Sequence, residues 1–145
     1  MLSEQRVADL LAAIGARTPS PASGAATALT GAIAAALAEL ASRFAGDEEG
    51  AVAAQVLGAE LVRLADEDSV VYAAFIADRN DATRANIIRV PEEIAARSDE
   101  VVALALRAAD QLSSSAAADA EAAAELARAS ARVARGLARF NSSGS

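Results

Sequence analysis

Alanine is the residue type that most restricts how this chain can fold. Hydrophobic residues make up 54% of the 145 positions and aromatic residues only 3%, so alanine supplies most of the apolar side chains. A core lined with methyl groups is filled by bringing backbones close together, because bulky side chains are scarce. Alanine is also the best helix former, and period-two alternation of β-branched residues is absent. The composition therefore predicts an all-α protein.

The apolar spacing predicts an antiparallel bundle of about five or six helices in one domain, residues 1–145, which is an ordinary domain length. The expected helices cover residues 3–14, 23–45, 47–78, 81–88, 91–112 and 116–140. Asp81 is expected to cap the short fourth helix. Pro91 is expected in the first turn of the fifth, where a missing N–H costs little. Residues 141–145 are expected to form a frayed tail.

Charge and missing residue types exclude several classes of function. The chain has a net charge of −7 and contains neither histidine nor cysteine. Disulfides, thiolate nucleophiles, Cys/His zinc sites and Ser-His-Asp triads are therefore excluded, and we expect no metal. The acidic balance argues against nucleic-acid binding, which needs clustered basic residues. Absence of cysteine and of a signal peptide fits the cytoplasm.

Residues 18–38 carry no charge, which raises the possibility of a membrane span. The segment contains Pro19 and Pro21 and is otherwise mostly alanine, a weak substitute for leucine in lipid. We therefore expect a buried helix and no membrane partner. Thr27, Gly31 and Ala35 recur at spacing four on it, so another helix can approach closely there. That contact is either intramolecular or the seam of a dimer.

Asp68 stands where the helical pattern calls for an apolar residue. Its neighbours three, four and seven positions away include Leu61, Leu64 and Phe75. A carboxylate on such a stripe loses hydration, and its pKa rises unless donors or a cation compensate. This situation is typical of functional sites, although a structural acid bonded to a neighbouring helix, or a hydrated seam, explains the spacing equally well.

Four further residues have ordinary explanations beside functional ones. Asp66 faces Val62 and Val70 and is a secondary candidate acid. Tyr72, one turn after Asp68, is either a hydroxyl donor to that acid or a ligand, or a core aromatic. Asp119 lies where a helix dipole favours an acid, and Asn141 reads as a helix cap.

Four segments, in order along the chain, carry a resemblance to a known family. They are Ala16-Arg17-Thr18-Pro19-Ser20-Pro21, Leu64-Ala65-Asp66-Glu67-Asp68-Ser69-Val70-Val71-Tyr72, Val90-Pro91-Glu92-Glu93-Ile94-Ala95, and Ala118-Asp119-Ala120 with the helix ending at Asn141. Together they resemble the formiminotetrahydrofolate cyclodeaminase and methenyltetrahydrofolate cyclohydrolase family. The resemblance implies an all-helical homodimer with its site near the subunit interface.

The resemblance also implies a reaction. The substrate is expected to be a small folate derivative, either 5,10-methenyltetrahydrofolate for hydrolysis or 5-formiminotetrahydrofolate for deamination, without a further cofactor. The implied catalytic residues are Asp68 and Asp66, and the implied ligand-binding residues are Ser23, Gly24, Tyr72, Asp119 and Asn141. One glycine, Gly24, remains where the family has three. This leaves open an impaired relative that serves as a ligand-binding or structural helical dimer, and a purely structural bundle.

Overall fold

Side-chain caps divide the chain into long helices joined by short loops. The computed structural model describes residues 1–144 and is all-α over that range. Asp47, Asn80 and Ser114 each accept a hydrogen bond from a backbone N–H of the helix that follows, which satisfies a donor that the helix itself cannot pair. The elements are the single-turn 3₁₀ helix η1 (Leu2–Glu4) and helices α1 (Val7–Gly15), α2 (Ser23–Phe44), α3 (Glu48–Ala77), α4 (Asp81–Asp110) and α5 (Ser115–Ser143).

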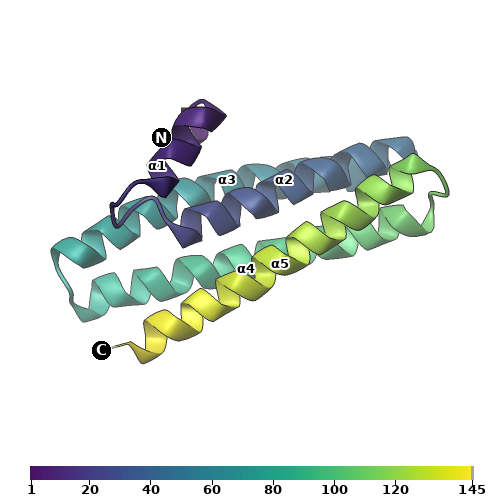
Figure 1. Ribbon diagram of the computed structural model, residues 1–145. Helices are drawn as coiled ribbons and strands as arrows, with labels where there is room; N and C mark the ends of the chain where they lie inside the picture. The colour runs from purple at the N-terminus through teal and green to yellow at the C-terminus, as the bar shows by residue number, and fades with distance from the viewer. Residues whose placement is uncertain (145) are drawn as a thin grey trace.

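Helices α2 to α5 run alternately up and down and form a four-helix bundle, with α1 projecting from its side (Figure 1). This arrangement confirms the predicted antiparallel helical bundle. The start of α2, the late part of α3, the start of α4 and the end of α5 lie at the same end of the bundle (Figure 1). Side chains far apart in the sequence are therefore brought together at that end.

The core is built largely from alanine, as the composition predicts. Its largest fully buried side chains include Leu61, Leu64, Val90, Ile94 and Val101. The small-residue line of α2 is an intramolecular contact. Thr27, Gly31 and Ala35 are all buried, and a Cβ on Gly31 would lie 2.9 Å from the Ser98 hydroxyl oxygen. Of the two alternatives, the internal helix contact is therefore the one that this line of small residues forms.

The predicted break between residues 88 and 91 is wrong. Residues 81–110 form one continuous helix, α4, with Pro91 in its interior and Asn80 rather than Asp81 as its cap. A proline inside a helix leaves the carbonyl four residues earlier without its N–H donor. Here that carbonyl belongs to Ile87, and the side-chain amide of Asn141 donates to it at 2.7 Å. Tertiary contact with α5 therefore allows the helix to continue.

The ends of the chain also differ from expectation. The first predicted helix is split into η1 and α1, and the last helix continues through Ser143 rather than ending at Phe140. Asn141 consequently lies within the last turn of α5 and does not cap it. Ser145, the last residue of the predicted tail, lies outside the described residues.

Helix α2 is the one helix within residues 1–144 that is long and apolar enough to cross a membrane by length and composition. Its most apolar window has a mean hydropathy of 1.5, and half of that window is buried inside the bundle. Burial of that kind is typical of a core helix, which passes the same test.

Candidate functional site

A small pocket lies at the end of the bundle where the connector and all four long helices meet. It encloses about 130 Å³. We call it the Asp68 pocket, and its lining residues are Ser20, Ala22, Ser23, Gly24, Asp68, Tyr72, Pro91, Leu137, Phe140 and Asn141. Five of the residues implied by the resemblance, Ser23, Gly24, Asp68, Tyr72 and Asn141, are therefore brought together by the fold.

The Asp68 carboxylate lies against the first turn of α2. Burial raises its pKa from 3.8 to about 6, because the charged form loses hydration, and a hydrogen bond from the Ala25 backbone N–H opposes the shift. The N-terminus of α2 favours negative charge, but Ala22, the residue before the helix, carries no side-chain acceptor. Asp68 therefore has a pKa near neutral pH, and its carboxylate, which belongs to α3, lies at the start of α2.

Gly24 is the position that makes this approach possible. A Cβ built there would overlap the Asp68 carboxylate, closer than real side-chain contacts allow. Any other residue at position 24 would force the carboxylate to move or the two helices to separate. The single glycine of this turn is therefore the one that contacts the acid.

The connector before α2 is attached to α3 beside the acid. Ser20 donates its hydroxyl to the Ser69 carbonyl oxygen at 3.3 Å. Tyr72, one turn after Asp68, is partly buried and lines the same pocket. Its hydroxyl makes no hydrogen bond with residues 1–144, so a bond to Asp68 is not formed, and a ligand contact and a core aromatic are the two remaining explanations of Tyr72.

Asp66 and Asp119 are not brought into this pocket. Asp66 is 7% exposed and accepts hydrogen bonds from the Ser3 backbone N–H at 3.2 Å and from the Ser3 hydroxyl at 2.6 Å. It therefore attaches η1 to α3, which is a structural role. Asp119 lies in the early turns of α5, at the opposite end of that helix from Asn141.

Sequence reasoning did not predict five of the ten lining residues of the Asp68 pocket, and besides Ser20 and Ala22 of the connector these are apolar side chains of α4 and α5. The apolar side chains are Pro91, Leu137 and Phe140. Leu137 lies three residues before Phe140 and four before Asn141, and this helical spacing was the available signal for Leu137. Phe140 is 74% exposed although it lines the pocket, so it forms a rim that solvent reaches.

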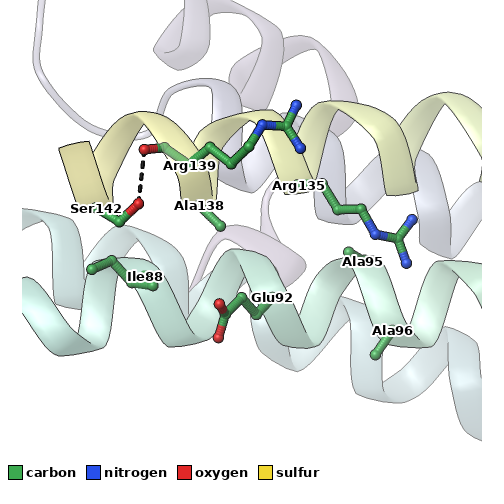
Figure 2. Close-up of a pocket in the computed structure, with 8 residues that line it drawn as sticks. All are labelled: Ile88, Glu92, Ala95, Ala96, Arg135, Ala138, Arg139 and Ser142. Carbon is green, nitrogen blue, oxygen red and sulfur yellow. Dashed lines mark hydrogen bonds between the residues drawn. The ribbon is translucent and has the colours of Figure 1, made fainter. Parts of the chain in front are cut away.

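A larger groove of about 340 Å³ lies between α4 and α5. Figure 2 shows Arg135 and Arg139 on α5 and Glu92 on α4 among the residues that line this groove. Arg135 forms an ion pair with Asp99, and its side chain is 49% exposed. Solvent screens exposed charges of this kind. The Asp68 pocket, whose acid is desolvated, is therefore the stronger candidate for chemistry.

Comparison with known proteins bears on the fold and the site together. A family model described as formiminotransferase-cyclodeaminase matches residues 6–144, nearly the whole chain. No curated protein sequence matches the chain. Within residues 1–144, no group of three His, Cys, Asp or Glu side chains lies close enough to hold a metal ion.

Proposed function

Because this chain belongs to the formiminotransferase-cyclodeaminase family, we propose that it acts on the one-carbon unit of a tetrahydrofolate derivative. The reaction is hydrolysis of 5,10-methenyltetrahydrofolate or deamination of 5-formiminotetrahydrofolate. The observation that carries the proposal is the desolvated Asp68 carboxylate, which shares a pocket with Gly24, Tyr72 and Asn141.

Asp68 suits both reactions as a proton carrier. The methenyl bridge is a cationic amidine carbon, and a carboxylate stabilises that charge while it accepts a proton from the attacking water. The water oxygen bonds to the methenyl carbon, one carbon–nitrogen bond breaks, and one proton is released overall. In the deamination, N10 attacks the formimino carbon and its proton passes to the formimino nitrogen. Protonated Asp68 then supplies the further proton with which the carbon–nitrogen bond breaks, so that ammonia leaves and the methenyl cation forms. An acid with a pKa of about 6 populates both forms near neutral pH.

The size of the pocket supports a second subunit. Sites that enclose a whole drug-sized ligand occupy roughly 300 Å³ or more. A volume of about 130 Å³ holds only the reacting end of a folate. We therefore propose a homodimer in which a second copy extends the site. The face of α2 turned away from the bundle is apolar and exposed, with Ile33 59%, Leu40 41% and Phe44 66% exposed.

Leu40→Glu is expected to convert the dimer to a monomer in analytical ultracentrifugation, because the new charge is desolvated when two α2 faces meet. The matched control is Leu106→Glu on α4, since Leu106 is also 41% exposed. That control is expected to leave the sedimentation coefficient unchanged. A wild-type protein that sediments as a monomer, or a Leu40→Glu variant that remains dimeric, contradicts this interface.

The activity itself is tested by the absorbance of 5,10-methenyltetrahydrofolate, and by ammonia release from 5-formiminotetrahydrofolate. We expect the wild-type protein to accelerate at least one reaction above the buffer rate by 100-fold or more, as general acid–base catalysis alone contributes about 10²–10⁴. Rates equal to buffer for both substrates contradict the enzymatic proposal.

The chain's charge of −7 and lack of cysteine support a cytoplasmic protein with a small-molecule substrate and neither a nucleic-acid nor a membrane partner.

A second candidate function is a ligand-binding or structural dimer without turnover. It is favoured by one observation, the close approach of the Asp68 carboxylate to the uncapped start of α2, because a negative charge at a helix N-terminus explains the acid without catalysis. A folate that raises the unfolding temperature in proportion to its concentration, with no turnover, distinguishes this function from the first.

A further inference from the structure

Pro91 occupies a position that normally disfavours proline. It lies eleven residues into α4, with helical backbone on both sides, and its side chain is fully buried. In an α-helix the N–H of residue 91 would donate to the carbonyl of residue 87. Proline has no N–H, so the Ile87 carbonyl lacks its helical partner. The Ile87 side chain is 3% exposed, so this part of α4 faces the protein interior.

The missing donor comes from the other side of the Asp68 pocket. The Asn141 side-chain nitrogen donates to the Ile87 carbonyl oxygen at 2.7 Å. Arg84, also on α4, donates to the main-chain carbonyls of Asn141 at 3.1 Å and of Gly144 at 2.6 Å. Hydrogen bonds from the Asn141 side chain and to main-chain carbonyls at the end of α5 thus hold its last turn against the first turns of α4.

We propose that Pro91 is a positioning residue that fixes the Asn141 amide in the wall of the pocket. Because Pro91 has no N–H, the Ile87 carbonyl oxygen is free to accept the hydrogen bond from the Asn141 side-chain nitrogen. The amide oxygen then takes the opposite direction from the nitrogen and accepts no hydrogen bond from residues 1–144. An oriented acceptor in a pocket with Asp68 favours a ligand that presents an N–H group or a delocalised positive charge.

The value of this orientation to the reaction rests on the proposed function. A cyclic amidine carries its positive charge between nitrogen atoms, so a carboxylate and an amide oxygen in one wall stabilise it together. Pro91 and Asn141 both line the pocket, so a loosened amide changes the surface that the ligand meets. Pro91 itself contributes no polar group, and its effect on the ligand is transmitted through Ile87 and Asn141.

A double-mutant cycle in urea unfolding tests the link without any ligand. Asn141→Ala is expected to lower the equilibrium constant for folding roughly tenfold in the wild-type background, because a carbonyl loses its donor. In the Pro91→Ala background the restored N–H at position 91 takes that carbonyl. Asn141→Ala is then expected to lower the constant by less than about threefold. Equal effects in the two backgrounds overturn the proposal.

A spectroscopic measurement on the unmutated chain keeps the test independent of how Pro91→Ala folds. The side-chain amide protons of Asn141 are expected to exchange with solvent at least about tenfold more slowly than those of Asn86, which is exposed on the same helix α4. Pro91→Ala is expected to remove that difference and to shift the Asn141 amide resonance. Equal exchange rates of the two amides in wild-type protein overturn the proposal.

Binding of 5-formyltetrahydrofolate separates this inference from the proposed function. Pro91→Ala and Asn141→Ala are each expected to weaken binding several-fold, and the double variant no further, because both changes release the same amide. Weakening by Asn141→Ala with unchanged binding in Pro91→Ala overturns the positioning role. If wild-type protein does not bind the folate at all, the proposed function fails, while the unfolding cycle and the exchange rates still decide the link between Pro91 and Asn141.

Discussion

Asp68→Asn is expected to make the folded protein more stable at pH 8 and to remove its turnover at the same time. Asparagine has the same shape and still accepts the Ala25 N–H, but it carries no charge to be desolvated. A folded-state pKa of about 6 against 3.8 corresponds to about 3 kcal/mol of unfavourable free energy in the ionised wild-type protein. Loss of a general base is expected to lower turnover by at least about 100-fold.

The sign of the pH dependence follows from the direction of that shift. Burial raises the pKa of Asp68, so between about pH 4 and pH 6 the folded protein binds more protons than the unfolded chain. The stability contribution of this group is therefore complete below pH 4 and is lost as the pH rises through 6. We expect the advantage of Asp68→Asn, measured by urea unfolding, to be about 3 kcal/mol above pH 6 and to disappear near pH 4.

The matched control is Asp110→Asn, which removes one negative charge at an exposed position of α4. It is expected to change neither the stability difference across this pH range nor the turnover. If Asp68→Asn is instead less stable than wild type at pH 8, the charge of Asp68 stabilises the N-terminus of α2. The cap then outweighs desolvation, which favours the structural dimer over the enzyme.

Gly24→Ala is expected to cost about 1–3 kcal/mol in the free energy of unfolding and to abolish turnover. The added Cβ overlaps the Asp68 carboxylate, and overpacking a filled site typically costs that much. Relief of the overlap requires the carboxylate to leave the Ala25 N–H, and the acid then no longer meets the ligand. Urea unfolding and the methenyltetrahydrofolate assay measure the two effects.

The Asp68→Ala background isolates this contact. With the carboxylate absent, Gly24→Ala is expected to be neutral or to stabilise by up to about 1 kcal/mol, since alanine is favoured over glycine in a helix. Gly136→Ala in α5 is the control, because its new Cβ meets only the Arg139 guanidinium at 3.8 Å, an ordinary contact. A cost of Gly24→Ala that is the same with and without the Asp68 carboxylate contradicts the contact.

The long helices were predictable because their signals are local. Apolar spacing predicted both ends of α2 and the end of α3 to within one residue, and the acids after Gly46 marked the approximate start of α3. The continuous helix α4 was not predictable. Its Pro91 has the appearance of a helix start, and only the distant Asn141 supplies the donor that keeps the helix intact.

The candidate site, like the fold, was predictable only in part. Helical spacing marked Asp68 as an acid on an apolar stripe, and the structure places it in a pocket with a pKa of about 6. The same spacing ranked Asp66 lower, yet Asp66 is the less exposed of the two acids, because Ser3 folds back over α3 and binds it. Periodicity reports which face of one helix is apolar, but it contains no information on what covers that face.

The all-α fold and the unusual position of Asp68 follow from the order of residues alone, because helix propensity and apolar period depend on neighbours within a few residues. What surrounds that acid depends on how the helices pack. Gly24 approaches it from α2 and Asn141 shares its pocket from the far end of α5. These contacts join segments that are close only after the helices pack, and packing of an alanine core depends on how near the backbones come.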